Sequence, residues 1–468
     1  MVSKKKIGYI LIVIFLIFHG LTVVFSSADS NTYEEFTIVF QKFRYLEEEC
    51  EDDAMFRIEC VVADKRYESP KLDVSYFGKD INWSITKIVP SSQRVYTISI
   101  SLYKSVNDHD ILCDLSPDPH SKSAEIVYSL NTGWWIGDDY HGDLSGYGRL
   151  NGCDDGSIYD FEDDAELWFA IRKTTPDGDG IPSWIEINEY GTDPFVDDRG
   201  TDYDNDGIPT EWEWYFGYHP KEWDDHENLD MDNDGLSNLE EFLTWGYGSD
   251  PFRPDIFLEI DCMAESPTGE SSLIPEEAIE MIHYPFHRRN YVIHVNRSDI
   301  IPFIERMNLN DLLFTYQQYF LQNDLDNWKR GVFHYAVYVY ETFPKGFAFS
   351  GDVEPYMGYH QGTNAFVISS SSMEHYARWF PQSLAYYYAS VTMHELGHNF
   401  GFRWGNPFGV DAQLGKYPWQ PMYYVYRNYK SIMNYRYTYK IFDYSDGTNG
   451  FLDHDDWSAL DLTYFLVP

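Results

Sequence analysis

Residues 393–401 read MHELGHNFG, and this stretch decides how the C-terminal half of the sequence is interpreted. Side chains four positions apart lie on one face of a helix, so His394 and His398 can bind one metal ion through their imidazole nitrogens. Glu395 then lies beside the open coordination position, where it can take a proton from a water molecule at the metal. The stretch therefore predicts a helix with a zinc site, in which His394 and His398 are ligands and Glu395 is the general base.

A second segment, SIMNY at residues 431–435, follows this helix along the chain. Together the two motifs resemble the metzincin clan of zinc endopeptidases, in which HExxHxxG is followed by a methionine-containing turn beneath the metal. The resemblance covers about residues 255–468 and is strong only at the two motifs. It implies that Met433 lies under the site. It also implies a catalytic role for Tyr435, as a zinc ligand or as a group that stabilises the transition-state oxyanion.

The third zinc ligand departs from the pattern of the clan. That ligand is usually a histidine and sometimes an aspartate three residues after the glycine, but this position is Trp404, which has no lone pair to offer a metal. No glutamate follows Glu395, which excludes a downstream glutamate ligand. We expect Asp411 to be the third ligand. His454 and an incomplete two-histidine site are the alternatives.

Between residue 255 and the zinc motif, apolar runs typical of strands alternate with helical patterns. Such alternation indicates an α/β sheet. Strands are expected at residues 255–261, 291–295, 332–339 and 365–369, and helices at 275–287, 310–322 and in a long segment ending near 400. Residues 255–468 are therefore expected to form an α/β (α+β) metzincin-like protease domain.

Between residues 174 and 254 the sequence repeats an acidic loop three times. D-x-D-N-D-G occurs at 202–207 and at 230–235, and a degenerate copy starts at Thr175, so the starts are 27 and 28 residues apart (202 − 175 and 230 − 202). In such a loop alternate oxygens wrap the ion, a glycine at position 6 permits the sharp turn, and a glutamate at position 12 closes the site.

These loops resemble thrombospondin type 3 repeats and dockerin-like calcium loops, in which bound Ca²⁺ substitutes for a hydrophobic core. We expect residues 174–254 to form a calcium-stabilised spacer, which loosens without Ca²⁺ because its clustered carboxylates repel one another. The predicted calcium ligands are Asp177, Asp179 and Glu186 in the first loop, Asp202, Asp204, Asp206 and Glu213 in the second, and Asp230, Asp232, Asp234 and Glu241 in the third.

Residues 1–28 have the pattern of a targeting segment. Three lysines at positions 4–6 precede a largely apolar run at residues 7–25, which is long for a signal-peptide core and borderline for a membrane span. Small residues at positions 26 and 28 favour cleavage as a signal peptide, and an N-terminal membrane anchor is the alternative. Either way residues 29 onward are expected outside the cytoplasm, secreted or anchored to the outer face of the cell membrane.

Residues 29–173 are expected to form an antiparallel β-sandwich, because short apolar runs are separated there by clusters of Asp, Gly, Pro and Ser. Four cysteines, Cys50, Cys60, Cys113 and Cys153, lie in this region. An even set in an exported region permits disulfides, with three possible pairings.

The whole chain carries 34 Lys+Arg against 76 Asp+Glu, a net charge of −42. Phosphates would repel this surplus of carboxylates, so a nucleic-acid binder and a binder of anionic lipid surfaces are both excluded in the simple electrostatic sense. Hydrophobic residues make up 43% and aromatic residues 18%, which is enough apolar material for folded domains. Bound cations are the obvious use for so many carboxylates.

These patterns predict a multidomain chain, with an N-terminal β-sandwich, a calcium-repeat spacer and a metzincin-like protease domain. The predicted function is that of an exported or membrane-anchored zinc endopeptidase, with Zn²⁺ and Ca²⁺ as cofactors and a protein or peptide as substrate. The alternative is a catalytically inactive, calcium-dependent binding or adhesion protein of the cell surface. Trp404 favours that alternative, as does the large share of the chain outside the protease-like domain.

Overall fold

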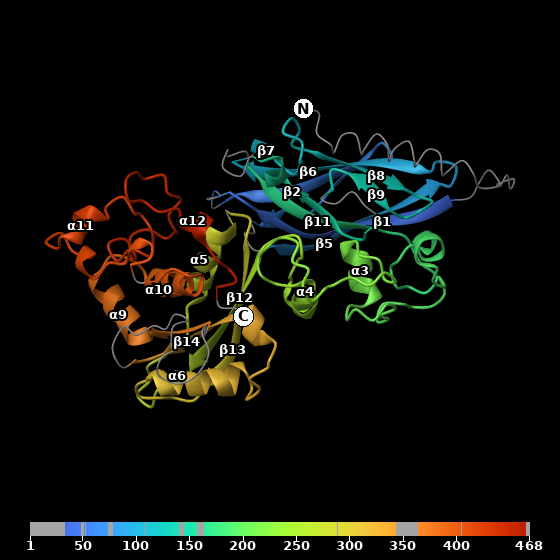
Figure 1. Ribbon diagram of the computed structural model, residues 1–468. Coiled ribbons are helices and arrows are strands. Elements are labelled where there is room, and N and C mark those ends of the chain that lie inside the picture. Colours follow the sequence, from blue (N-terminus) through green and yellow to red (C-terminus); the bar gives the residue numbers. More distant parts are fainter. Residues whose placement is uncertain are drawn as a thin grey trace.

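The structure is a computed structural model, and it describes residues 33–47, 51, 53–73, 78–107, 109–139, 145–156, 163–287, 289–342, 364–403 and 405–464. The predicted targeting segment, Cys50 and Trp404 lie outside these residues. Among the residues described, no helix has the length and apolar character that crossing a membrane requires. Figure 1 shows a sandwich of strands, a loop-rich segment along one of its sides, and an α/β unit.

The N-terminal part consists of two β-sheets that face each other. One sheet has the strand order β10-β11-β1-β5, and the other has the order β3-β2-β6-β8-β9, with β4 and β7 pairing at its side. Side chains alternate along each strand, so Phe36, Ile38 and Phe40 of β1 all enter the core between the sheets. The strands are β1 (Tyr33–Tyr45), β2 (Met55–Val62), β3 (Lys65–Glu68), β4 (Leu72–Asp73), β5 (Lys79–Pro90), β6 (Val95–Val106), β7 (His109–Cys113), β8 (Ala124–Ser129), β9 (Trp135–Gly137), β10 (Gly148–Asn151) and β11 (Ala165–Arg172).

The spacer is a series of three loops, each followed by a short helix. The helices are α2 (Ser183–Ile185), continued by η2 (Glu186–Tyr190), then α3 (Thr210–Phe216) and α4 (Asn238–Thr244). The spacer also has an aromatic core of its own, since Trp212 and Phe216 of α3 pack with Tyr147 and Trp168 from the sandwich side. It therefore lies against the sandwich and does not depend on bound ions alone.

The C-terminal domain contains a four-stranded sheet in the order β13-β12-β14-β15, with every strand parallel to its neighbours. Along β12, Ile256, Leu258 and Ile260 pack with α5 and α10, whereas Phe257 packs with α6 on the opposite face. All nine residues of β12 are buried because helices cover both faces. The elements are β12 (Asp255–Met263), α5 (Glu276–His287), β13 (Val292–Ile301), α6 (Leu309–Thr315), η4 (Tyr316–Phe320), α7 (Lys329–Val332), β14 (Phe333–Val339), β15 (Ala365–Ser369), α9 (Ser370–Trp379), α10 (Leu384–Asn399), β16 (Phe408–Asp411), η5 (Gln413–Gly415), α11 (Met422–Val425) and α12 (Asp456–Ala459).

The fold class predicted for this domain needs correction. Four of the five described strands of residues 255–468, β12 to β15, form an all-parallel sheet, and the short strand β16 lies outside it. The chain after α10 runs mainly through turns and short helices, without the metzincin-like fold that was predicted. The error has a physical cause. The HExxHxxG and SIMNY motifs constrain one helix and one turn, and neither constrains the order of strands in the sheet behind them.

The sandwich contacts the C-terminal domain directly. Glu166 of β11 is fully buried between Arg44 and Arg149, and the Arg44 and Glu166 side chains approach to 2.7 Å. Arg44 also donates to the carbonyl of Tyr291 at 3.1 Å and to the side chain of Asn290 at 3.0 Å, both in the turn before β13. A buried charge is costly unless it is paired, so this network ties the two domains together.

Candidate metal centre

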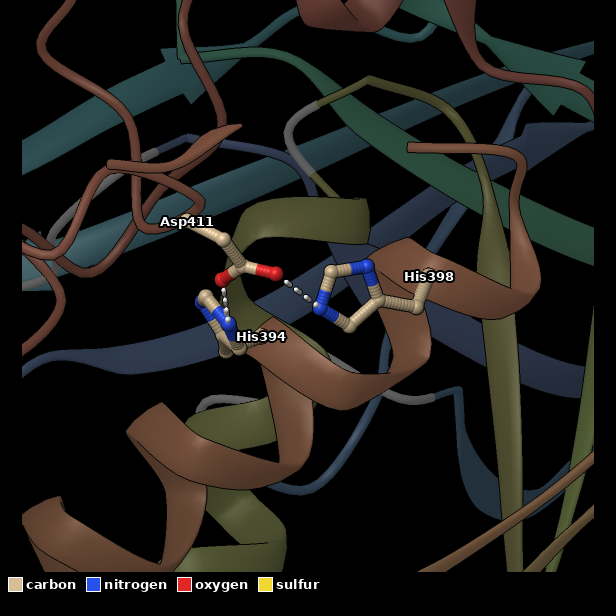
Figure 2. A group of neighbouring side chains, drawn as sticks. All are labelled: His394, His398 and Asp411. Atoms are coloured by element: carbon tan, nitrogen blue, oxygen red, sulfur yellow. Dashed lines mark hydrogen bonds and ion pairs between the residues drawn. The ribbon is translucent and has the colours of Figure 1, made fainter. Parts of the chain in front are cut away.

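Helix α10 carries the two histidines of the HExxH motif. The helix begins after Ser383, whose hydroxyl accepts a hydrogen bond from the backbone N–H of Tyr386 at 3.1 Å and caps the first turn. His394 and His398 lie one turn apart on the face of α10 that Figure 2 shows, and both are buried. The helix therefore presents two imidazoles to one point in space.

Backbone carbonyls orient both rings. Nδ1 of His394 donates to the carbonyl of Ile432 at 2.9 Å, and Nδ1 of His398 donates to the carbonyl of Phe402. A carbonyl only accepts, so each Nδ1 carries a proton, and each Nε2 faces the Asp411 carboxylate. The Nδ1 hydrogen bonds fix the orientation of both rings, and a metal bound at Nε2 would displace a proton held there.

Asp411 is the third member of the group. It ends strand β16 in a left-handed conformation (φ +53°), which an aspartate adopts more readily than most residues. Its N–H donates to the carbonyl of Met433 at 3.1 Å. Its carboxylate oxygens lie 3.0 Å from Nε2 of His394 and 3.3 Å from Nε2 of His398. Figure 2 shows the carboxylate bridging the two rings.

The three side chains lie close enough to share one ion. Donors at about 2.0 Å from a tetrahedral ion lie about 3.3 Å apart, and here the two Nε2 atoms are 3.0 and 3.3 Å from the two separate oxygens of Asp411, which are hydrogen-bond distances. One ligand atom from each of His394, His398 and Asp411 lies within 4.8 Å of the others. His454, the alternative third ligand, is exposed and packs near Tyr429 instead. Two imidazoles and a carboxylate with an open fourth position form a donor set that fits catalytic zinc.

Charges in the group complement one another. Burial lowers the pKa of His394, but its hydrogen bond to Asp411 and the charge of that carboxylate outweigh burial and raise the pKa to about 9. Burial opposes ionisation of Asp411, yet the hydrogen bonds from His394 and His398 hold its pKa far below the usual range. The carboxylate is therefore ionised at neutral pH and ready to bind a cation.

Glu395 and Tyr435 complete the site. Burial raises the pKa of the Glu395 carboxyl, and the neighbouring histidines partly oppose that rise. The ring of Tyr435 stacks on His394 with centroids 5.6 Å apart, and burial followed by the charge of Asp411 raises the pKa of its hydroxyl. Both residues line a cleft of about 640 Å³ that also reaches His394. The tyrosine therefore stays a neutral hydrogen-bond donor beside the predicted metal.

The SIMNY segment lies directly beneath the helix. Met433 is fully buried, and a Cβ added at Gly397 would lie only 2.4 Å from its sulfur, so α10 and this turn approach as closely as a glycine allows. In the same turn, the Ile432 carbonyl accepts a hydrogen bond from Nδ1 of His394, and the Met433 carbonyl accepts one from the N–H of Asp411. It thus positions two of the three predicted ligands.

The three spacer loops gather most of the predicted calcium ligands, but among the described residues Glu213 groups only with Asp206 and His226, and Glu241 belongs to no such group. One ligand atom from each member lies within 4.8 Å of the others in three carboxylate groups, and the closing glutamates are buried. The position-6 glycines have φ between +95° and +101°, where a side chain would be strained. The groups are Asp177, Asp179 and Glu186; Asp202, Asp204 and Asp206; and Asp230, Asp232 and Asp234.

Each closing glutamate carries carboxylate oxygens that lack a protein partner. Both oxygens of Glu186, both of Glu213 and one of Glu241 are buried without a hydrogen bond. Burial, followed by the charge of the neighbouring aspartates, raises the pKa of Glu186 to about 8 and that of Glu213 to about 9. The pKa of Glu241 is raised well above its usual value by burial and the charge of Asp255. Such orphaned oxygens are the ligands that Ca²⁺ takes.

The structure adds His226 to the second loop. Its Nε2 lies 3.1 Å from the carboxylate of Asp206, and Asp206, Glu213 and His226 form a group within 4.8 Å. Nothing in the loop pattern marks His226, which follows position 12 by 13 residues. Only the folded chain brings it to the carboxylates.

The third loop is joined to the C-terminal sheet. The Asp234 carboxylate accepts the N–H of Asp255, the first residue of β12, at 2.7 Å. The Asp255 carboxylate in turn accepts from Arg253 at 2.8 Å and lies 2.8 Å from Nε2 of His294. Loop 3 and the start of β12 therefore share one buried polar network.

No protein-family model and no curated protein sequence matches the chain. Among solved structures, it is similar to human GIVD cytosolic phospholipase A2 bound to a fluorophosphonate inhibitor and terbium chloride (12% identity, 31% of this chain, 18% of that chain, TM-score 0.19). It is also similar to a pair of C2 domains from extended synaptotagmin 2 (11%, 33% and 48%, 0.20) and to a C2 domain of plant extended synaptotagmin 1 (8%, 30% and 96%, 0.19). The chain spans less than a fifth of the phospholipase chains it matches.

These comparisons correct part of the sequence analysis. None of the solved structures named above is a metzincin: they are C2 domains and a phospholipase. The predicted metzincin-like fold class and the predicted classification within that clan of metalloproteases are therefore corrected.

Proposed function

We propose that this chain is an extracytoplasmic, calcium-dependent binding protein whose C-terminal domain hydrolyses peptide bonds at a zinc ion. One observation carries the hydrolytic part. His394 and His398, one turn apart on α10, and Asp411 at the end of β16 bring one ligand atom each to within 4.8 Å of one another, and Glu395 lines the adjoining cleft. A site of this kind is independent of the fold that carries it, so the comparisons with C2 domains leave it open.

The protein side chains have distinct tasks in this reaction. Zinc, when bound, supplies a Lewis acid that polarises the scissile carbonyl and makes water a stronger acid. Glu395 accepts the proton of the attacking water and returns it to the leaving amine. Burial raises the pKa of the Glu395 carboxyl, which makes its carboxylate a stronger base than an exposed one. Tyr435 donates a hydrogen bond to the developing oxyanion.

The binding part of the proposal rests on the spacer. Its three carboxylate groups contain orphaned buried oxygens, which a cation would satisfy. The third group is bonded to the first residue of β12. Calcium would therefore order the junction that sets the C-terminal domain against the sandwich. Export or membrane anchoring through residues 7–25 would supply the calcium-rich compartment that such loops need.

The test is cleavage of an unstructured protein substrate by residues 29–468 with Ca²⁺ and Zn²⁺, measured for the wild type and for Glu395→Ala. Glu280→Ala, at an exposed position of α5, is the matched control. We expect the wild type and Glu280→Ala to cleave equally, and Glu395→Ala to lose at least a hundredfold in rate, about the contribution of a general base. Zinc content should stay at one equivalent in all three.

The second candidate function is calcium-dependent binding by a chain with an inert C-terminal site. The comparisons favour it, and it predicts the opposite result in the same experiment. No cleavage by a folded wild-type chain that holds one zinc would leave binding as the function. Equal cleavage by the wild type and by Glu395→Ala would show that a contaminant is responsible.

A further inference from the structure

The cleft beside the predicted metal centre contains a lysine that the proposed reaction does not use. Lys416 follows η5 and lines the same cleft as His394 and Glu395. Its ammonium group lies 5.8 Å from the ring centroids of Tyr376 and Tyr417. Aromatic faces hold a cation in place without neutralising it. The side chain is half-buried, so it is held in the wall of the cleft and does not extend into solvent.

No carboxylate of the described residues pairs with Lys416. The cleft wall includes Glu341, but that carboxylate is paired with Arg306 at 2.8 Å. Glu395 and Asp411 are committed to the metal centre, where a divalent ion would balance their two charges. Among the described residues that line the cleft, Lys416 is thus a cation without an anionic partner, in a chain whose net charge is −42.

The rest of the wall near Lys416 suits a side chain of moderate length. Met373 and Tyr376 of α9 and Val391 of α10 supply apolar surface, and Tyr439 stacks near Tyr376 with centroids 4.7 Å apart. The same wall also carries polar side chains, namely Ser369, Ser371, Ser372, His375, Gln413 and Thr438, so the lining is mixed. A cation without an anionic partner in such a wall favours an anionic ligand group, because a ligand cation would be desolvated there beside a like charge.

We infer that Lys416 selects substrates with a carboxylate next to the scissile bond. This inference rests on the proposed peptide hydrolysis and adds the substrate class. The carboxylate has two possible sources: the side chain of an aspartate or glutamate, or the free carboxyl terminus of a peptide. In either case Lys416 binds the substrate and takes no part in proton transfer.

The experiment uses residues 29–468 with Ca²⁺ and Zn²⁺ and a set of synthetic peptides that differ at one position beside the cleaved bond, carrying Glu, Gln or Lys. Each peptide is made with a free and with an amidated carboxyl terminus. We expect the wild type to cleave a carboxylate-bearing peptide about tenfold faster than its neutral partner. A preference for Glu over Gln identifies the side chain as the source, and a preference for free over amidated peptides identifies the terminus.

Charge variants show whether Lys416 is responsible. Lys416→Arg should keep the preference, Lys416→Gln should abolish it, and Lys416→Glu should reverse it towards the Lys peptide. Lys430→Glu, at an exposed position outside the cleft, should leave it unchanged. Binding of the same peptides to the zinc-loaded Glu395→Ala variant, measured by calorimetry, should follow the same order without turnover.

The outcomes distinguish a failure of the role inferred for Lys416 from a failure of the proposed peptide hydrolysis. Cleavage of all peptides at equal rates, or the same preference in Lys416→Glu as in the wild type, would overturn the role of Lys416 and leave the hydrolase intact. Failure of the folded, zinc-loaded wild type to cleave any peptide would overturn the proposed function itself.

Discussion

The two kinds of predicted metal site in this chain balance their charges in opposite ways. On α10, two imidazoles face one carboxylate, so the group is internally paired, with Asp411 at 3.0 and 3.3 Å from the histidine nitrogens. In the spacer loops, carboxylates gather with one another, joined in the second loop by His226 at 3.1 Å from Asp206, and the buried oxygens of Glu186 and Glu213 have no hydrogen-bond partner. The group on α10 satisfies its charges with its own hydrogen bonds, whereas the spacer loops need a cation to satisfy theirs.

This difference teaches what each ion contributes. Burial of unpaired carboxylates is costly, so Ca²⁺ contributes mainly to the stability of the spacer and of the junction that it forms. The histidine centre is surrounded by a packed helix and turn, so zinc contributes mainly chemistry. Removing calcium should therefore change the fold, and removing zinc should change the reaction.

The largest predicted effect is that of calcium removal. A site saturated a thousandfold above its dissociation constant adds about 4 kcal/mol to stability, so three sites would add about 12 kcal/mol. Chelation of Ca²⁺ should lower the unfolding temperature by more than ten degrees in a calorimetric scan, whereas removal of zinc alone should lower it by far less. Equal shifts of the unfolding temperature after removal of calcium and of zinc would contradict the difference predicted between the two kinds of site.

The next effect distinguishes one calcium loop from another. Glu241→Gln should remove calcium from loop 3 and, at about 4 kcal/mol, destabilise the C-terminal domain as well, because Asp234 of that loop holds the start of β12. Glu186→Gln in loop 1 is the matched control and should destabilise only the spacer. Hydrogen exchange of the β12 amides measures the difference, and equal protection in both variants would contradict the coupling.

A third prediction concerns pH. Asp456 is fully buried, and burial raises the pKa of its carboxyl to about 7, although hydrogen bonds from Ser431, the Ser445 backbone and Tyr429 oppose the rise. The folded state therefore favours the neutral acid. The stabilisation is fully present below about pH 4 and is lost as pH rises through 7, by up to about 4 kcal/mol.

Asp456→Asn should remove this part of the pH dependence, since an amide keeps the shape and cannot ionise. Chemical denaturation at pH 5 and pH 8 would show a smaller difference for the variant than for the wild type. An unchanged difference would mean that the carboxyl is not the group responsible. The predicted metal centre does not contact Asp456, so zinc content should be equal in both proteins.

The smallest effect is that of Tyr435→Phe. Loss of one donor to a developing oxyanion should lower the rate of peptide hydrolysis about tenfold to a hundredfold, with little change in zinc content. Tyr426→Phe, a tyrosine outside the cleft lining, serves as the control. A large loss of zinc from Tyr435→Phe would instead make this tyrosine a ligand.

Short-range patterns in the sequence predict candidate metal ligands, most of which the structure brings together. The four-residue spacing of His394 and His398 needs only a helix, and the twelve-residue loops need only a turn at a glycine and a following helix. The assignment of Asp411 is a longer step, because its place depends on the turn that bonds it to Met433. The sequence does not indicate which distant residues meet in the folded chain.

The architecture and the cleft depend on residues that are far apart in the chain. Nothing local indicates that Arg44 of β1 would bond to the Tyr291 carbonyl, or that His226 would reach Asp206. The metzincin-like fold was predicted wrongly for the same reason, since two motifs were extended to a whole domain. No sequence pattern marks Lys416. Only the folded chain places it in the cleft wall with residues of α9 and α10.

The most direct test of the metal centre is X-ray absorption fine structure at the zinc edge, for the wild type and for Asp411→Ala, with calcium present. The account predicts one zinc per chain in the wild type, with two imidazoles and a carboxylate among its nitrogen and oxygen ligands at about 2.0 Å, and loss of zinc in the variant. Unchanged zinc binding in Asp411→Ala, sulfur ligation, or a folded wild type that binds no zinc would contradict it.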